Sequence, residues 1–215
     1  MPEKLKIKHI ALVFFSLLIL AVISYYSLDL RTALWIRAHL SPKMIKIFEA
    51  LTLPIEPLLV PSYLLLIFIL SSKGSAFLKT LNDFATSTLF NLGIVPIIKA
   101  LFPRPRPSYF LSHGLYQIMP SQFLPEFISM PSGHASGAGL LCGFIYLYTQ
   151  GRKRLFMLVP VLFMTFRILC LKHFPSDCLV GFAIGFCLVL IFYKRSELLI
   201  NKIKGLIWKN GKIAL

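Results

Sequence analysis

Long apolar stretches alternate with short polar segments along this chain. Several of the stretches approach the roughly 20 residues that a helix needs to cross the hydrocarbon core of a bilayer. The pattern predicts six membrane-spanning helices, at about residues 9–28, 51–70, 76–101, 135–148, 155–171 and 178–193. We therefore expect an all-α, polytopic membrane helical bundle of about six transmembrane helices, which forms a single domain over residues 1–215.

Two segments outside these helices mix basic and apolar residues. Residues 31–50 contain Trp35, and residues 196–215 contain Trp208 among lysines. Cationic residues interspersed with Leu, Ile and Trp are typical of helices that lie in the membrane interface. The pattern predicts such a surface helix for the tail, residues 196–215.

The composition fits a membrane protein and excludes an ordinary soluble domain. Of the 215 residues, 57% are hydrophobic and only 14% are charged, whereas about 25% are charged in soluble domains. The net charge of +15 would suit nucleic acid or anionic lipid. In a membrane protein, however, Lys and Arg gather in cytoplasmic segments and set the topology. We therefore expect membrane lipids, and no nucleic acid, as partners; the four cysteines lack metal-type spacing and read as free thiols.

The positions of the basic residues predict the orientation. With both termini inside, most of the 23 Lys and Arg residues fall on the inner side of the membrane. The positive-inside rule then places both termini in the cytoplasm. The small size and the outward polar residues suit, by analogy, a bacterial inner membrane with a site that faces the periplasm or exterior.

Polar residues capable of chemistry gather at the outer ends of four predicted helices. They are Lys99, Arg106, Ser132, Gly133, His134, Arg167, His173 and Asp177. Ionisable residues at membrane depth are expensive and by default suggest function. Their placement at one depth, from segments tens of residues apart, predicts a single site.

Three of these residues are cations that suit a phosphate. Lys99, Arg106 and Arg167 combine a point charge with planar guanidinium forks. Ser132 is placed to cap the helix that follows, whose free N–H groups attract an anion, and Gly133 allows close backbone approach. The pattern predicts a pocket for a tetrahedral dianion, while Arg104 reads as an ordinary residue of a membrane-exit loop.

The two histidines and the carboxylate suit phosphoryl transfer. The imidazole of His173 can attack phosphorus and form a phosphohistidine. Asp177 is expected to accept the Nδ1–H of His173, and His134 to protonate the leaving oxygen and then activate water. The three residues could alternatively ligate zinc. The neighbouring cations would repel a metal ion, so we expect neither a metal nor another cofactor.

Three spaced sequence blocks resemble the type 2 phosphatidic acid phosphatase (PAP2) superfamily. They are Lys99 to Arg106-Pro107, Pro131-Ser132-Gly133-His134, and Arg167 to His173 to Asp177, so that the motif core covers residues 99–177. The resemblance implies a metal-independent phosphatase with His173 as nucleophile, Asp177 as its orienting partner and His134 as acid and base. It also implies that Lys99, Arg106, Ser132, Gly133 and Arg167 hold the phosphate. One departure is Phe166, where the family usually has Ser.

The expected function is hydrolysis of a lipid phosphomonoester or pyrophosphate at the outer face of the membrane. The substrates considered are undecaprenyl pyrophosphate, lipid A phosphate, phosphatidylglycerol phosphate and phosphatidic acid, and nothing in the sequence selects among them. A lipid phosphotransferase that uses the same phosphohistidine, or a non-catalytic lipid-phosphate binder or transporter, are the alternatives. The small residues 135–139 are expected to let a neighbouring helix approach closely and to bring Lys99 and Arg167 near His134.

Overall fold

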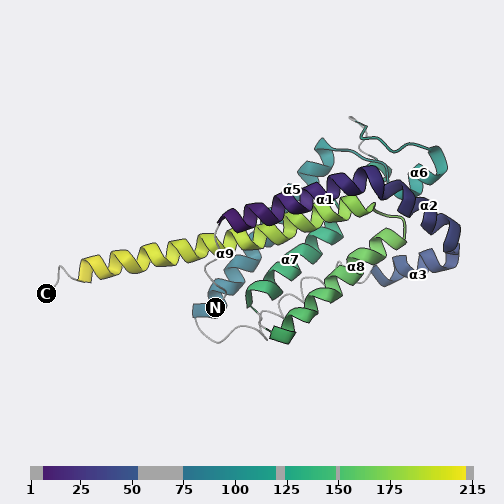
Figure 1. The fold of residues 1–215 in the computed structure, drawn as a ribbon. Helices are drawn as coiled ribbons and strands as arrows, with labels where there is room; N and C mark the ends of the chain where they lie inside the picture. Colours follow the sequence, from purple (N-terminus) through teal and green to yellow (C-terminus); the bar gives the residue numbers. More distant parts are fainter. Residues whose placement is uncertain (1–6, 53–74, 120–123, 149–150, 212–215) are drawn as a thin grey trace.

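The computed structural model describes residues 7–52, 75–119, 124–148 and 151–211, and within them it is helical and has no β-strand (Figure 1). The helices are α1 (Ile7–Ser27), α2 (Asp29–His39), α3 (Pro42–Thr52), α5 (Ser75–Leu101), α6 (Pro107–His113), α7 (Gly133–Tyr148), α8 (Leu158–Leu169) and α9 (Pro175–Gly211). Two 3₁₀ turns, η1 (Pro125–Phe127) and η2 (Gly151–Met157), join them.

Three helical segments are long and apolar enough to cross a membrane. They are Ile7–Ser27, Lys79–Leu101 and Pro175–Leu198. This confirms the all-α membrane bundle. Of the other predicted spans, α7 and α8 cover the fourth and fifth with 16 and 12 residues, and most of the second lies outside the described residues.

The tail departs from the prediction. No separate surface helix begins at residue 196 in the described structure. Instead, α9 is one unbroken helix of 37 residues, Pro175–Gly211, whose last part projects beyond the rest of the bundle (Figure 1). The physical reason is that Lys194, Arg195 and Glu197 end the apolar pattern but are themselves good helix formers. A change of polarity therefore does not mark a helix end here.

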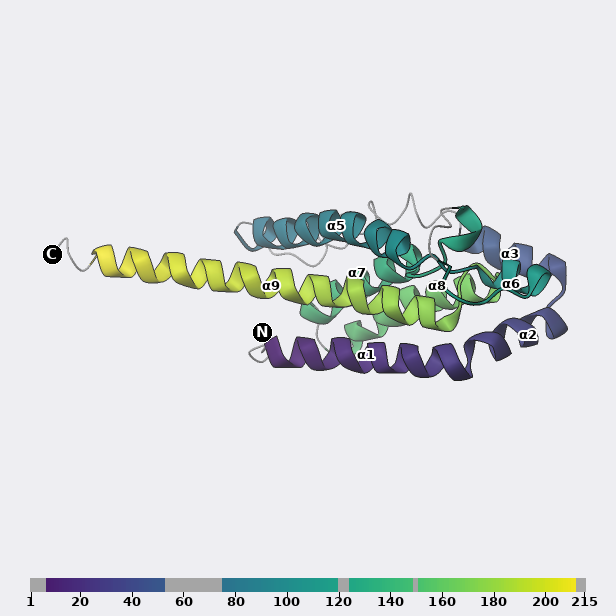
Figure 2. The ribbon, with the colours of Figure 1, turned by 90° about the horizontal axis from the view of Figure 1, so that it is seen from above.

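Glycines let α7 and α9 pack at close range. A Cβ at Gly139 would collide with the backbone oxygen of Phe182, and a Cβ at Gly185 would collide with that of Ser136. Small residues spaced by four positions allow such backbone approach between membrane helices. The small residues 135–139 were expected to let a neighbouring helix approach closely, and the helix that does so is α9. In Figure 2, α9 lies between α1 and α5.

The chain directions bring the functional segments to one end of the bundle. The last residues of α1, α5 and α8 meet the first residues of α7 and α9 there, beside α2, α3 and α6 (Figures 1 and 2). The opposite end carries the first residues of α1. An apolar core from α1, α5, α7 and α9 fills the body of the bundle, with Leu140, Phe144 and Val189 among its buried members.

Candidate active site

Four basic side chains lie around a fifth, His173, at this end of the bundle. The four are Lys99, Arg106, Arg167 and His134, and each contributes to the electrostatic field at His173. Burial of the imidazole, followed by these positive charges, holds the pKa of His173 well below its ordinary value. The structure thus brings these predicted site residues to one end of the bundle, and the lowered pKa of His173 favours its neutral form.

Each of the three cations among the predicted phosphate ligands donates a hydrogen bond to the protein, and none forms an ion pair with a carboxylate of the described residues. Lys99 Nζ donates to the carbonyl of Ile128 at 2.7 Å, and Arg106 Nε donates to the carbonyl of Pro125 at 2.9 Å. An Arg167 guanidinium N–H donates to Thr52 Oγ1 at 3.0 Å, and Arg167 is only 8% exposed. The buried Nε of Arg167 has no hydrogen-bond partner within the described structure. Their charge is therefore available to an anion.

The orientation of His173 differs from the expected one. Its Nδ1 lies 2.8 Å from the backbone carbonyl of Ser129, not against Asp177. A carbonyl oxygen only accepts hydrogen bonds, so Nδ1 carries the proton and the lone pair is on Nε2. A contact with the main chain thus sets the tautomer of His173 that leaves Nε2 with a free lone pair.

Asp177 acts on His173 through Ser129. One carboxylate oxygen, Oδ2, accepts from Ser129 Oγ at 2.6 Å and from the Phe174 N–H at 2.8 Å. The other, Oδ1, pairs with Arg104 at 2.6 Å. Asp177 therefore fixes the residue whose carbonyl holds the imidazole, and it does so from the first turn of α9.

Arg104 is the largest correction to the sequence interpretation, because it is fully buried. Its guanidinium pairs with Asp177 and, at 2.8 Å, with Asp29, and it donates to Ser176 Oγ at 2.7 Å. The rings of Tyr25, Tyr116 and Phe174 surround its Cζ at 4.7, 4.8 and 4.3 Å. Arg104 thus ties the end of α1 to the start of α9 beneath the site.

Asp29 completes this buried group. It is 0% exposed, and its carboxylate accepts from Ser24 Oγ at 2.9 Å and from the backbone N–H and hydroxyl of Ser176. Asp29, Ser129, Ser176 and Thr52 were not identified from sequence. Asp29 had a usable signal, since an acidic residue next to an apolar span is rare in a chain with 8 Asp and Glu in total.

The start of α7 forms one wall of the site. Ser132 Oγ accepts the N–H of Ala135 at 3.3 Å, which confirms the predicted cap. The Ser132 N–H donates to the Asp177 carbonyl at 3.0 Å, so the starts of α7 and α9 are joined. A Cβ built on Gly133 would meet no atom within 4 Å, so open space adjoins this helix start.

Phe166, which stands where the PAP2 family usually has Ser, packs against another aromatic ring. Its ring stacks on Phe48 of α3 with centroids 5.6 Å apart. Thr165 cannot supply the missing hydroxyl, because its Oγ1 donates to the Val161 carbonyl at 3.0 Å. Thr52 instead places a hydroxyl against Arg167. Among the residues the structure describes, no three His, Cys, Asp or Glu side chains are grouped to hold a metal ion.

Comparisons with known proteins agree with these observations. A model of the PAP2 superfamily matches residues 80–199. A lipid A 1-phosphatase of Rhizobium etli is 30% identical over 118 residues, which are 53% of this chain and 50% of that protein. A lipid A 1-phosphatase of Rhizobium johnstonii is 29% identical over 100 residues, covering 46% and 41%. The chain thus spans about half the length of the curated relatives it matches.

Two solved structures share the fold. The crystal structure of Aquifex aeolicus LpxE has a TM-score of 0.57 and 21% identity, and the match covers 79% of this chain and 96% of that one. A transmembrane PAP2-type phosphatidylglycerolphosphate phosphatase from Bacillus subtilis has a TM-score of 0.56 and 21% identity, covering 87% and 96%. These likenesses support the membrane bundle described above.

Proposed function

Because this chain belongs to the PAP2 superfamily, we propose that it is a membrane lipid phosphatase that works through a phosphohistidine on His173. The observation that carries the proposal is the environment of that imidazole. His173 is 3% exposed, its Nδ1 is fixed by the Ser129 carbonyl, and it lies in the field of cations with no acidic partner among the described residues. A neutral, oriented imidazole beside unpaired positive charge suits attack on a phosphate dianion.

In the first half-reaction, the Nε2 lone pair of His173 attacks phosphorus. An N–P bond forms and the bond from phosphorus to the lipid oxygen breaks. Burial and the neighbouring cations lower the pKa of His134 to about 4 in the empty site, so His134 takes up a proton from solvent as the bound dianion offsets these cations. It then gives that proton to the lipid oxygen, and the lipid leaves as an alcohol. Lys99, Arg106 and Arg167 meet the negative charge on the other phosphoryl oxygens.

In the second half-reaction, water releases the phosphate. His134, now neutral, takes a proton from a water molecule whose oxygen attacks phosphorus. The N–P bond breaks, its electron pair returns to Nε2 of His173, and inorganic phosphate departs. The N–H groups at the start of α7 and the open space beside Gly133 accept the phosphate, as a helix start favours an anion.

The substrate class follows from the membrane setting and the relatives. A phosphate site at one end of an apolar bundle suits a phosphomonoester or pyrophosphate that is carried on a lipid. Since two relatives carry the name lipid A 1-phosphatase, lipid A 1-phosphate is the first candidate. The others are undecaprenyl pyrophosphate, phosphatidylglycerol phosphate and phosphatidic acid. The positive-inside rule supports an orientation with this end outside. A bacterial inner membrane is proposed by analogy, because the named relatives are bacterial.

The test is a phosphate-release assay on purified protein in detergent, with each candidate lipid and with EDTA present. We expect release from at least one lipid and no effect of EDTA. His173→Ala and His173→Asn should both abolish release, whereas His113→Ala should retain it, because His113 is an exposed imidazole on α6. Turnover by the His173 variants, or loss of activity in EDTA, would contradict the proposal.

The same assay separates hydrolysis from phosphoryl transfer. Labelled phosphate that appears in a second lipid rather than in solution would identify a phosphotransferase. Binding of the lipid without either product would identify a binder or transporter. The proposal predicts free inorganic phosphate in an amount equal to the lipid consumed.

A further inference from the structure

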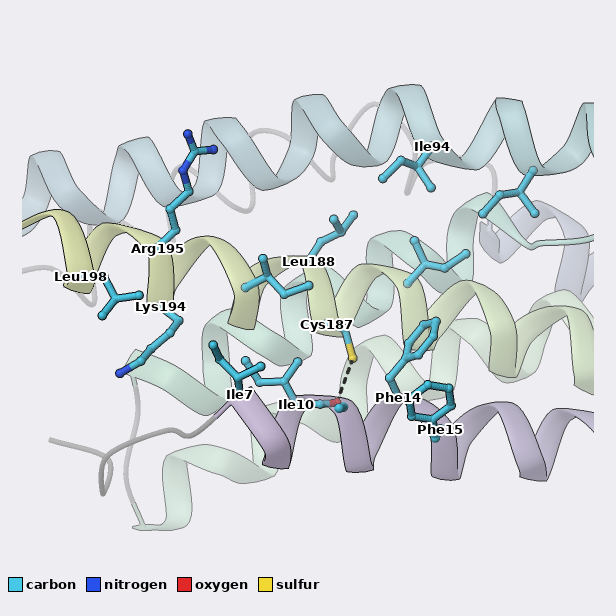
Figure 3. Close-up of a pocket in the computed structure, with 14 residues that line it drawn as sticks. Ile7, Ile10, Phe14, Phe15, Ile94, Cys187, Leu188, Lys194, Arg195 and Leu198 are labelled. Carbon is cyan, nitrogen blue, oxygen red and sulfur yellow. Dashed lines mark hydrogen bonds between the residues drawn. The ribbon is translucent and has the colours of Figure 1, made fainter.

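An apolar groove runs along α9 between α1 and α5 (Figure 3). It encloses about 720 Å³, within the range of about 300–1,000 Å³ that is typical of small-molecule pockets. Ile10 and Phe14 of α1, Ile94 of α5 and Leu188 of α9 are among its lining residues. Apart from Cys187 and two cations, every lining side chain is a hydrocarbon.

The two cations, Lys194 and Arg195, lie at the end of the groove away from the first residue of α9. Figure 3 shows their side chains diverging, with Arg195 directed toward α5 and Lys194 to the other side of α9. Lys194 Nζ pairs with Glu197 at 2.6 Å. No carboxylate of the described residues forms an ion pair with Arg195. The groove therefore joins a hydrocarbon surface to a positive charge that lacks a partner there.

Distance separates this end from the candidate active site. Both Asp177 and Lys194 are on α9, and the helix rises about 26 Å between them at about 1.5 Å per residue. That is close to the roughly 30 Å thickness of the hydrocarbon core. A lipid whose phosphate contacts His173 therefore cannot place the same headgroup at Arg195. The cationic end of the groove belongs to the opposite face of the membrane.

We propose that the groove binds an anionic glycerophospholipid from the leaflet opposite the active site. Its phosphodiester contacts Arg195, which has no ion-pair partner among the described residues, and an acyl chain lies between α1 and α5. From Ile184 to Leu198 the groove follows about 21 Å of helix, which suits a chain that crosses most of one leaflet. Charge complementarity selects an anionic headgroup over a zwitterionic one.

The lipid would also attach α1 to the bundle. Only Ile10, Ala21 and Ser24 of α1 are buried, and Ile7, Ala11 and Phe15 are among its side chains that line the groove. An acyl chain in contact with both α1 and α5 would add packing to these side chains. Binding to the folded protein alone then raises its stability in proportion to lipid occupancy.

Native mass spectrometry of the full-length protein, titrated with phosphatidylglycerol or phosphatidylcholine, tests this. Phosphatidylglycerol is a phosphodiester, so a phosphomonoesterase does not consume it. We expect phosphatidylglycerol to bind more tightly. Arg195→Gln should weaken it about fivefold, because one Lys or Arg near an anionic lipid contributes about 1 kcal/mol, and should leave phosphatidylcholine unchanged. The matched control is Arg154→Gln, which removes an exposed charge outside the groove.

A second variant fills the groove directly. Ala11 lines it, so Ala11→Trp should reduce binding of both lipids while circular dichroism and gel filtration stay unchanged, and Ala11→Leu should do so partly. Equal binding of the two lipids, or equal loss in Arg195→Gln and Arg154→Gln, would overturn the proposal. A raised KM for the lipid substrate in Ala11→Trp, with phosphatidylglycerol binding unaffected, would assign the groove to the substrate tail. A dimer that excludes lipid would assign it to a second copy. Phosphate release by the unaltered protein is measured separately, so failure here leaves the proposed function standing.

Discussion

Replacing Arg104 tests the buried ion pairs beneath the site. The guanidinium and both of its carboxylate partners, Asp29 and Asp177, are 0% exposed, at 2.8 and 2.6 Å. Arg104→Met leaves two negative groups buried with no compensating charge. Breaking a buried pair in this way costs about 3–5 kcal/mol. That is a large share of the 5–15 kcal/mol typical of a folded domain.

The measurement is thermal unfolding in detergent, followed by circular dichroism, together with phosphate release. For a chain of this length, 3–5 kcal/mol corresponds to a fall in Tm of about 6–20 °C. The control is Arg31→Met, because Arg31 is exposed on α2. Arg104→Lys should fall between the two, because an ammonium cannot reproduce the planar fork that contacts Asp29, Asp177 and Ser176 together.

A double variant identifies the cause of the loss. Asp29→Asn removes one of the stranded charges, so Arg104→Met combined with Asp29→Asn should lose less stability than the two single changes added together. If Arg104→Met unfolds at the same temperature as Arg31→Met, the buried pairs do not stabilise the fold. Simple additivity in the double variant would show that Arg104 and Asp29 are not coupled, which would contradict this prediction.

Three further predictions follow from the packing and the site. Gly185→Ala should destabilise by about 1–3 kcal/mol, because its Cβ collides with the Ser136 carbonyl, whereas Gly93→Ala, with open space around it, should be neutral or stabilising; equal unfolding temperatures would contradict this. Ser129→Ala should cost about 1–3 kcal/mol and lower kcat more than it raises KM, since Asp177 loses a donor while the carbonyl that holds His173 remains; an unchanged kcat would contradict it. The pKa of His173 is lowered in the folded state, so the unfolded chain binds the proton first and stability falls as the pH drops below about 6.5; the fall in Tm between pH 7 and 5 should be smaller in His173→Asn, and an equal fall would show that His173 is not buried in its neutral form.

Much of the bundle follows from local features of the sequence. The apolar runs predicted α1, α5 and α7 to within a few residues, since a helix that crosses a membrane needs only length and hydrophobicity. The end of α9 could not be found this way, because charged residues that close an apolar run are also good helix formers. Residues 53–74, which include most of the second predicted span, lie outside the described structure.

The residues of the spaced motifs could be predicted from the sequence. The residues that contact the site through long-range pairs could not. The residues at positions 99, 106, 134, 167, 173 and 177 could be identified from the sequence, because they are ionisable residues at membrane depth. Arg104 was not, because its partner Asp29 is 75 residues away and an arginine after a helix usually contacts solvent. The role of Ser129 was also hidden, since its backbone carbonyl, present at every residue, contacts the imidazole.

Trapping the covalent intermediate tests whether His173 is the nucleophile. Purified protein is mixed with a lipid phosphate that it hydrolyses, quenched within milliseconds to seconds, and digested for mass spectrometry under conditions that preserve N–P bonds. We expect one phosphoryl group on the peptide that contains His173. We expect a larger amount in His134→Asn with a substrate that has a good leaving group, because hydrolysis of the intermediate needs the base. Turnover with phosphate on another residue, or release without any phosphorylated histidine in either protein, would contradict the assignment of His173.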